Sequence, residues 1–197
     1  MKPQTILFFG LVGCGKGTQA KLLTEHFKAL NPEIDSIELS TGNEYRKFIA
    51  NSGYVSGLIK SVLDAGKLQP DFLTIWISTD FLIKQLDRPE KHVIFDGFPR
   101  SIMQAKALEQ FVTFFDRKDA KIIYITLSKE EGIKRMKLRN RHDDTDEGIQ
   151  NRFAEYENNV IPAMEYFKNK KNYEMIEIDG EQTVEKVQAD ILKSLGL

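Results

Sequence analysis

The pattern of apolar and polar positions predicts five short buried strands separated by helices. Each strand candidate is a run rich in β-branched or aromatic residues, as expected for strands covered on both faces. The five runs are residues 5–9, 35–39, 92–96, 121–127 and 173–179. After the first run, Ala20, Leu23, Phe27 and Leu30 recur at helical spacing. Strands that alternate with helices predict an α/β fold with a parallel sheet, whose ligands bind at the carboxyl ends of the strands.

A long segment separates the second and third strand candidates. It spans about fifty residues, more than one crossover helix requires. Residues 43–69 are therefore interpreted as an inserted helical lobe, in which Gly53, Gly57 and Gly66 are expected to punctuate the helices. The sequence contains no internal repeat or low-complexity segment. A chain of 197 residues is long enough for one domain with a good core, so residues 1–197 are predicted to form a single domain.

Composition and charge exclude several classes of protein. The chain is 41% hydrophobic and 29% charged, with a formal net charge of -1, which favours neither a nucleic acid nor an anionic membrane as partner. Its apolar runs are too short to cross a bilayer. The single cysteine, Cys14, excludes an intramolecular disulfide and a cysteine-rich zinc site. Read as a lipoprotein signal, the stretch before Cys14 is short and carries only Lys2 as a positive charge, so we expect a cytoplasmic protein.

The most informative motif follows the first strand candidate. Residues 10–18 read Gly-Leu-Val-Gly-Cys-Gly-Lys-Gly-Thr. Glycines allow such a loop to turn sharply and to point its N–H groups into one concavity at a helix N-terminus, where phosphate binds. Lys16 adds a positive charge for the terminal phosphates, and Thr18 adds a hydroxyl near a magnesium ion. The strict pattern has Ser or Thr directly after the lysine, whereas here Gly17 intervenes, and the alternative is an ordinary glycine-rich turn.

A second motif closes the third strand candidate, where residues 93–100 read Val-Ile-Phe-Asp-Gly-Phe-Pro-Arg. Asp96 ends an apolar strand beside a phosphate loop, which is where such enzymes hold magnesium directly or through water. Arg100 offers a planar guanidinium that can bind a phosphate in two places. By itself the Asp-Gly pair reads as an ordinary turn; beside the loop it predicts a magnesium-nucleotide site.

Further arginines occur in the last third of the chain. Arg135 and Arg139 are four residues apart on a predicted helix and therefore share a face. Arg141 follows, and Arg152 is expected to open the last helical section. Taken alone they read as a solvated basic face. Together with Arg100 and the phosphate loop they predict a clamp around several phosphates.

An acidic run lies between these arginines, where residues 142–147 read His-Asp-Asp-Thr-Asp-Glu. The run could be read as a metal site. We favour a helix start, because Asp144 or Thr145 can cap the following helix and the acidic residues then lie at its positive end.

Taken together, these motifs resemble the adenylate kinase family, of the short-lid kind, over nearly the whole chain. The matching segments, in the family's order, are Gly-Lys-Gly-Thr-Gln at 15–19, Ser40-Thr41-Gly42 with Arg46, residues 64–68, residues 96–100 with Gln104, Arg135 with Arg139, Asp143-Asp144, Arg152, and Asp179-Gly180. The family accounts for Gly17, because its phosphate loop carries Gly-Thr after the lysine. The resemblance implies a P-loop NTPase-like, five-stranded parallel sheet with helices on both faces, a lobe for a nucleoside monophosphate at about 40–69 and a very short lid at about 138–144.

The resemblance also implies an activity and its residues. The activity is reversible, magnesium-dependent transfer of the ATP γ-phosphoryl group to AMP, giving two ADP, by a monomeric enzyme of nucleotide biosynthesis without structural zinc. ATP is expected at Gly13, Cys14, Gly15, Lys16, Gly17, Thr18, Arg135, Arg139 and Gln182. AMP is expected at Thr41, Arg46, Lys67, Leu68, Gln69, Gly97, Phe98, Pro99, Arg100, Gln104, Arg141 and Arg152. The catalytic set is Lys16, Arg100, Arg139, Arg141 and Arg152, and magnesium is expected at Asp96 through water, with Thr18 as a further candidate ligand.

Two departures from the family concern acceptor choice. Asn43 stands where aspartate is usual, and Gln69 replaces a small apolar residue. They leave open a kinase for UMP or CMP, or one of broad specificity. Thr41, where pyrimidine-nucleotide kinases typically have alanine, favours AMP, and so does Gln104, whose carboxamide can pair with an adenine edge.

The lid is a third departure, because only Asn140 separates Arg139 from Arg141. So short a lid should exclude water poorly, and we expect measurable ATP hydrolysis in the absence of AMP. Two other classes of protein fit less well. A nucleotide-binding switch should lack Lys16, Asp96 or the arginines, and a shikimate- or gluconate-type kinase does not need residues 97–100 with Gln104.

Overall fold

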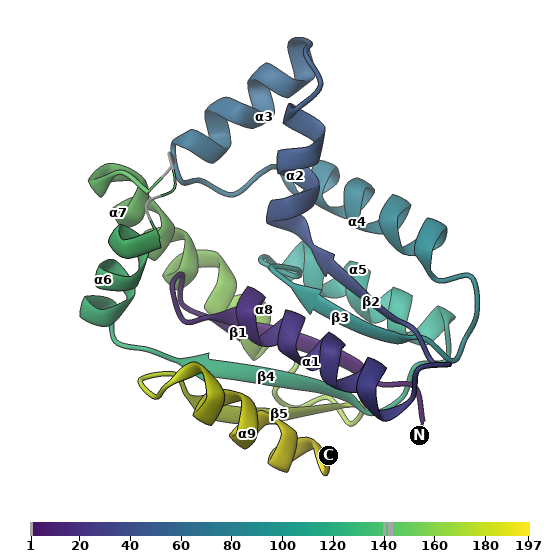
Figure 1. Ribbon diagram of the computed structural model, residues 1–197. Helices are drawn as coiled ribbons and strands as arrows, with labels where there is room; N and C mark the ends of the chain where they lie inside the picture. Colours follow the sequence, from purple (N-terminus) through teal and green to yellow (C-terminus); the bar gives the residue numbers. More distant parts are fainter. Residues whose placement is uncertain (1, 140, 142–143) are drawn as a thin grey trace.

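The computed structural model describes residues 2–139, 141 and 144–197 of the chain. Its centre is a sheet of five parallel strands in the order β2-β3-β1-β4-β5 (Figure 1). The strands are β1 (Thr5–Gly10), β2 (Ser36–Ser40), β3 (His92–Asp96), β4 (Ala120–Thr126) and β5 (Tyr173–Asp179). The five strands predicted from the sequence are thus confirmed, with ends that differ by no more than about one residue.

Helices cover both faces of this sheet, as the alternating pattern predicted. They are α1 (Lys16–Leu30), α2 (Thr41–Ile49), α3 (Tyr54–Asp64), α4 (Asp71–Gln85), α5 (Ile102–Phe114), α6 (Lys129–Arg139), α7 (Asp146–Glu155), the π-helical turn η1 (Tyr156–Val160), α8 (Ile161–Glu165) and α9 (Val184–Leu195). One correction concerns Arg152, which lies within α7 rather than at the start of the last helical section. Helix α7 begins at Asp146, six residues before Arg152, and the sequence did not show where this helix starts.

The central strand β1 shows why the sheet is covered on both sides. Every residue of β1 is buried. Ile6 and Phe8 belong to the cluster packed under α1 and α9, whereas Leu7 and Phe9 belong to the cluster under α4, α5 and α8. Successive side chains of a strand point to opposite faces, so a strand covered on both sides must be apolar throughout. This accounts for the continuous apolar run before the glycine-rich loop.

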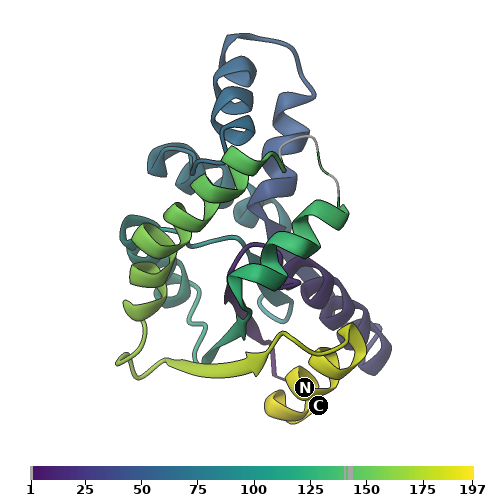
Figure 2. The ribbon, with the colours of Figure 1, turned by 90° about the vertical axis from the view of Figure 1, so that its left-hand side faces the viewer.

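Helices α2 and α3 stand above the carboxyl edge of the sheet, within the segment predicted to form a lobe (Figure 1, Figure 2). They share a small apolar cluster with α4 that contains Tyr45, Ile59 and Ile77. Of the three glycines expected to punctuate this segment, Gly57 does not, because it lies inside α3. A single glycine weakens a helix without ending it when its neighbours favour the helix.

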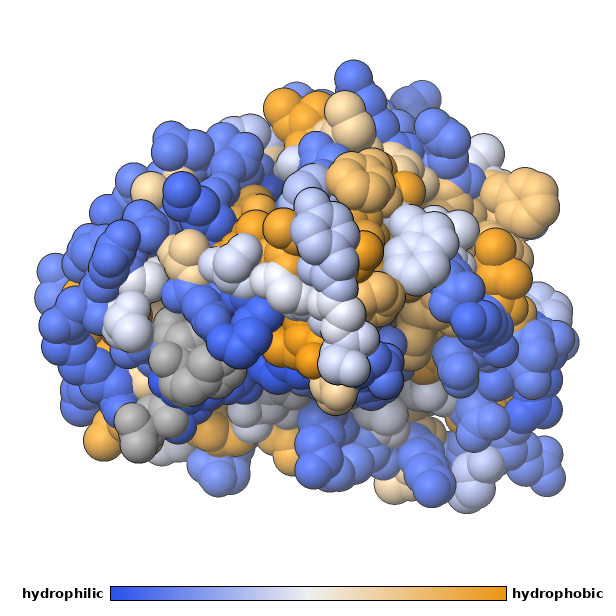
Figure 3. Space-filling model, turned by 90° about the horizontal axis from the view of Figure 1, so that it is seen from above, coloured by the Kyte–Doolittle hydropathy of each residue, from blue (hydrophilic) through white to orange (hydrophobic). Residues whose placement is uncertain are grey.

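Exposed apolar side chains occur on this part of the molecule. Four large apolar side chains of α3 and α4 are at least half exposed: Tyr54, Leu58, Phe72 and Trp76. The view from above shows apolar side chains among hydrophilic ones over the centre and right of this face (Figure 3). Within the described residues, none of the helices has both the length and the apolar character needed to span a membrane.

Candidate active site

A cleft of about 960 Å³ lies at the carboxyl edge of the sheet, below the α2–α3 segment. It is bordered by the glycine-rich loop after β1, the end of β3, and helices α6 and α7. The predicted site residues that line it are Gly13, Gly15, Lys16, Gly17, Thr18, Arg46, Lys67, Leu68, Asp96, Gly97, Pro99, Arg100, Arg135, Arg139, Arg141 and Arg152. Residues from six separate stretches of the chain therefore meet at one opening, as the rule for parallel sheets predicts.

The glycine-rich loop forms the floor of this cleft and leads directly into α1. Gly15, the residue before the helix, has φ +97°, a left-handed conformation that L side chains rarely adopt. Gly13 also has positive φ, and a Cβ there would lie 2.9 Å from the carbonyl oxygen of Gly132. The first turn of α1 carries no acidic side chain. Its N-terminal N–H groups and its positive dipole end thus face the cleft with no carboxylate from the helix's own first turn, which suits phosphate.

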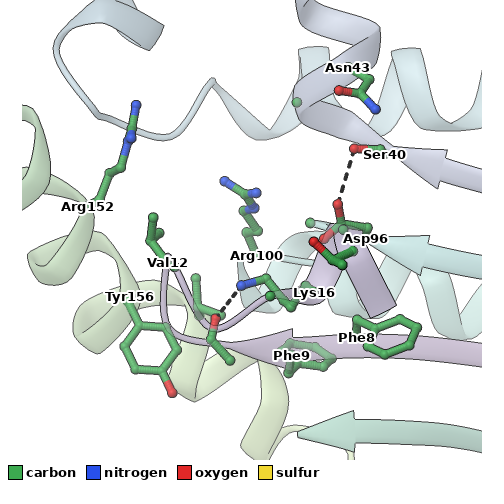
Figure 4. A pocket seen from close by; sticks show the side chains of 18 of the residues that line it. Phe8, Phe9, Val12, Lys16, Ser40, Asn43, Asp96, Arg100, Arg152 and Tyr156 are labelled. Atoms are coloured by element: carbon green, nitrogen blue, oxygen red, sulfur yellow. Dashed lines mark hydrogen bonds between the residues drawn. The ribbon is translucent and has the colours of Figure 1, made fainter. Parts of the chain in front are cut away.

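Lys16 lies across this loop. Its ammonium donates a hydrogen bond to the carbonyl oxygen of Gly10 at 2.7 Å (Figure 4) and another to the carbonyl oxygen of Leu11 at 3.0 Å. The positive charge is therefore held on the loop itself, at the place where a phosphate chain cradled by the loop would lie.

Asp96 lies opposite the start of α1. Its Oδ2 accepts a hydrogen bond from the Ser40 hydroxyl at 3.2 Å, across the adjacent ends of β2 and β3 (Figure 4). A Cβ on Gly17 would come within 3.3 Å of the same oxygen. The glycine after the lysine thus leaves room for the Asp96 carboxylate beside the helix, and Thr18 follows it in the cleft lining.

These oxygen donors fit magnesium carried by a nucleotide. Mg²⁺ prefers oxygen ligands, keeps several waters, and usually takes only one or two groups from the protein besides substrate phosphates. Among the residues that the structure describes, no group of three or more His, Cys, Asp or Glu side chains could hold a metal by itself. Asp96 and Thr18 are therefore the kind of sparse ligand set that a magnesium–nucleotide complex needs.

Glu38 of β2 also lines the cleft, and the sequence did not single it out. Burial raises its pKa, and the negative charge of Asp96 raises it further, while Lys21 acts in the opposite direction. An acidic residue inside a strand is unusual, so the sequence marks Glu38 as atypical. The sequence does not indicate that its side chain faces the cleft.

Arg100 is a cation of the site whose pKa is shifted. Desolvation by burial lowers its pKa; the carboxylate of Asp96 opposes this, whereas the charges of Arg152 and Arg46 add to it. Figure 4 shows the Arg100 and Arg152 side chains pointing into the cavity from different elements. Several guanidinium groups thus converge there, which is unfavourable unless an anion lies between them.

Asp144 supplies one such anion from the protein. Arg139 binds its two oxygens with Nε at 3.0 Å and Nη2 at 2.8 Å, and Arg152 Nη1 donates to Oδ1 at 2.5 Å. Burial acts to raise the Asp144 pKa, yet the hydrogen bonds and charges of the two arginines outweigh it and lower this pKa. Of the two helix-cap candidates, Thr145 is the cap, accepting from the Gly148 N–H at 3.0 Å. Asn140 and Asp143 lie outside the described residues.

Six predicted site residues do not line the cleft. They are Cys14, Thr41, Gln69, Phe98, Gln104 and Gln182. Thr41 instead donates to the Gly97 carbonyl oxygen at 2.7 Å, and the Gln69 amide donates to the Ile59 carbonyl oxygen at 2.8 Å. Gln182 binds Asp179 and Asp190. Pattern matching did not anticipate these side-chain directions, because each depends on a partner distant in the sequence or on local turns.

Tyr156 is a cleft residue that the sequence did not reveal (Figure 4). It begins the π-helical turn η1 and donates a hydrogen bond to the Tyr124 hydroxyl at 3.2 Å. Burial, followed by that hydrogen bond, raises its pKa, so it remains a neutral phenol. Its direction depends on the wide turn, which no local sequence pattern predicts.

The known proteins that this chain resembles share one family description. The family model described as "Adenylate kinase" matches residues 8–172. A curated adenylate kinase from Oenococcus oeni is 35% identical over 181 residues, covering 92% of this chain and 93% of the relative. Another, from Azobacteroides pseudotrichonymphae, is 35% identical over 191 residues, covering 95% and 94%. A third, from Flavobacterium psychrophilum, is 34% identical over 198 residues, covering 96% and 98%.

Proposed function

The chain belongs to the adenylate kinase family, and from this premise we propose how its own residues carry out the reaction. It is a nucleoside monophosphate kinase, which transfers the γ-phosphoryl group of ATP reversibly to AMP and gives two ADP. The observation that carries the assignment of roles is that Arg100, Arg139 and Arg152 line the same cleft as the phosphate loop with its Lys16.

The ATP half of the site is the loop and the start of α1. Loop N–H groups around Gly13 and Gly15 and the Lys16 ammonium would bind the β- and γ-phosphates. Arg135 would lie against the adenine. Its guanidinium is held by Glu131, whose carboxylate accepts from Nε at 2.8 Å. This ion pair leaves one face of the planar group for stacking.

The AMP half lies on the other side of the cleft. Arg46 and Arg100 would bind the AMP phosphate, and Lys67 and Leu68 border the same opening. Arg46 is oriented by Asn43, whose Oδ1 accepts from its Nη1 at 3.1 Å. The asparagine that departs from the family pattern thus still holds the phosphate-binding arginine.

The chemical step needs positioning rather than a general base. The attacking AMP phosphate has a second pKa near 6, so most of it is fully ionised at pH 7. Its repulsion from the γ-phosphate is offset by the arginines, and Asp144 holds two of them, Arg139 and Arg152, at fixed distances. Arg141, which also lines the cleft, would join them.

Magnesium enters this proposal with the nucleotide. Thr18 and Asp96 would hold it, Asp96 through water, with the Ser40 hydroxyl orienting the carboxylate. When bound, the ion neutralises charge on the phosphates and helps to align them. Zinc has no role in this proposal.

Exclusion of water falls to the elements above the cleft. The Asn151 amide of α7 donates to the Ala65 carbonyl oxygen at 2.9 Å, which joins the end of the α3 segment to α7. We propose that 40–69 acts as the lobe that binds the monophosphate and that 138–144 acts as a minimal lid. Both would close before transfer, because water competes as a nucleophile.

We further propose a monomer in the cytoplasm with ATP and AMP as its partners and no nucleic acid. Its only cysteine, Cys14, is buried and free, which fits a reducing compartment. The near-neutral net charge of -1 gives no general attraction to polyanions.

A coupled assay for ADP formation tests the function. ATP with magnesium is offered AMP, GMP, CMP and UMP in turn, and kcat/KM is compared. We expect AMP to lead the panel. Equal or faster turnover of UMP or CMP would replace the assignment with a pyrimidine or broad-specificity kinase.

A further inference from the structure

Asp71 holds the side chain proposed to read the acceptor base. It is the first residue of α4 and directly follows the α2–α3 segment and its connection. Its Oδ1 accepts two hydrogen bonds, from the Ser101 hydroxyl at 2.7 Å and from the Gln104 amide nitrogen Nε2 at 2.8 Å. On its other side, Gln104 Oε1 accepts from the backbone N–H of Arg100 at 2.8 Å. Gln104 is 1% exposed.

These two contacts allow only one orientation of the Gln104 carboxamide. An ionised carboxylate only accepts hydrogen bonds, and a backbone N–H only donates them. A reversed amide would set Oε1 against the Asp71 carboxylate and Nε2 against the Arg100 N–H, so both contacts would become repulsive. A carboxamide has two N–H donors and two lone pairs on its oxygen. The protein uses one of each, and one of each remains for a ligand.

The orientation of that remaining pair matters for purines. Along its six-membered ring, adenine presents an acceptor at N1 and a donor at its 6-amino group. A 6-oxopurine presents the reverse, a donor at N1 and an acceptor at O6. A carboxamide fixed in one orientation pairs with one of these edges, and a carboxamide free to reverse pairs with both.

We propose that Asp71 is a positioning residue that sets acceptor specificity for 6-aminopurine over 6-oxopurine monophosphates by fixing the orientation of Gln104. The inference rests on the proposed function and on the expectation from the sequence that the Gln104 carboxamide pairs with the acceptor base. Its place in the fold supports this: Gln104 binds the backbone of Arg100, whose guanidinium lines the cleft. Gly97, in the same loop, lines the cleft too and is held by Thr41. Gln104 itself is buried and does not line the cleft, so the proposal requires the side chains that cover it to move aside when the base binds.

The test replaces Asp71 by an isosteric group that can also donate. In Asp71→Asn, the new amide can donate to Gln104 Oε1, so the reversed orientation loses the repulsion at residue 71 and keeps only the one at the Arg100 N–H. The acceptors are AMP and IMP, because IMP changes the edge in question without adding a 2-amino group. We expect the ratio of kcat/KM for IMP to that for AMP to rise about tenfold, the size typical of a lost bidentate base contact. Asp71→Ser, whose hydroxyl also donates, should shift the ratio the same way and serves if Asp71→Asn folds poorly.

Ser101→Ala is the matched control. It removes the other hydrogen bond to Asp71 Oδ1 and weakens the start of α5, where the Ser101 hydroxyl accepts from the Gln104 N–H at 3.1 Å. It leaves both constraints on the Gln104 carboxamide. Its melting temperature should fall, whereas its IMP-to-AMP ratio should stay at the wild-type value. An unchanged ratio in both Asp71 variants, or an equal shift in Ser101→Ala, overturns the proposal.

Gln104→Leu separates this inference from its premise. A raised KM for AMP in Gln104→Leu, with an unchanged ratio in the Asp71 variants, overturns the role of Asp71 alone. An unchanged KM for AMP in Gln104→Leu overturns the base-reading role of Gln104, and the inference with it. In either case ADP formation from ATP and AMP by the wild type still tests the kinase activity separately.

Discussion

The Lys16 ammonium lies 2.7 Å from the carbonyl oxygen of Gly10, the residue at which β1 ends and the phosphate loop begins. The charge is therefore held on the loop before any nucleotide arrives. A group already positioned in this way loses little freedom when a phosphate replaces a carbonyl as its partner, which favours tight and well-oriented binding of ATP.

Lys16→Met should remove turnover and preserve the fold. Methionine keeps much of the length of lysine but not its charge, and the lost hydrogen bonds go to backbone oxygens at the edge of the cleft. We expect kcat to fall by roughly 10²- to 10³-fold or more, with a near-normal thermal melt. Near-normal ADP formation in this variant would contradict the role of the loop.

Asp144→Asn should slow the reaction by loosening Arg139 and Arg152. The Asp144 side chain is only 1% exposed, and its charge offsets both guanidinium groups. Without that charge the arginines repel each other and lose their fixed spacing, so kcat should fall about 10- to 100-fold. Asp146→Asn, at an 86% exposed carboxylate near the same helix start, is the control and should keep kcat. Equal losses in the two variants would count against the bridge.

Gly66→Ala should impair acceptor binding. Gly66 has φ +68°, and a Cβ there would collide with the backbone of Gly148 in α7. Alanine therefore costs about 1 kcal/mol or more of unfolding free energy from backbone strain and pushes the α3 segment away from α7, which should raise KM for AMP several-fold. The control is Gly57→Ala, because a Cβ at this position inside α3 meets no other atom. This substitution should raise the unfolding free energy by about 0.5–1 kcal/mol, since alanine favours a helix over glycine. If Gly66→Ala leaves KM for AMP unchanged, this contact does not shape the acceptor site.

His92 should make the protein less stable in mild acid. The side chain is 1% exposed, stacks on Phe27, and accepts a hydrogen bond from the Gln4 N–H at its Nδ1. Burial, followed by the charge of Arg117, lowers its pKa from 6.5 to about 4. Between these values the unfolded chain binds the extra proton, so stability falls as the pH drops from 6.5 to 4, by about 3 kcal/mol in total.

The measurement is urea unfolding at a series of pH values between 4 and 7. His92→Asn, which cannot titrate, should show a flatter dependence of the unfolding free energy on pH across this window. Parallel curves for the wild type and the variant would assign the acid sensitivity to other groups.

ATP hydrolysis without AMP should be measurable. Helix α6 ends at Arg139 and helix α7 begins at Asp146, so few residues between the two helices are available to cover the transferring phosphoryl group. Because a poorly covered site admits water as the nucleophile, we expect slow release of inorganic phosphate from ATP and magnesium alone. Lys16→Met provides the background rate, and a wild-type rate no higher than this would mean that the site is covered by other elements.

The fold of this protein could be predicted from the sequence because its strands are local features. Five apolar runs, each bounded by turns or helices, were enough to place every strand, and parallel connections then brought Gly10, Ser40 and Asp96 to one edge. The phosphate loop is equally local, since its glycines and Lys16 act through backbone conformation within nine residues.

The tertiary structure alone decided the contacts between residues far apart in the chain. Gln104, expected to face the acceptor, is buried between Asp71 and the Arg100 backbone, and Gly66, expected only to end a helix, packs against Gly148. Periodicity determines which face of an element is apolar, whereas the partner of a single polar side chain depends on how whole elements pack. A motif can therefore name the members of this site, but the hydrogen bonds that orient them follow from the packing of α4, α5 and α7.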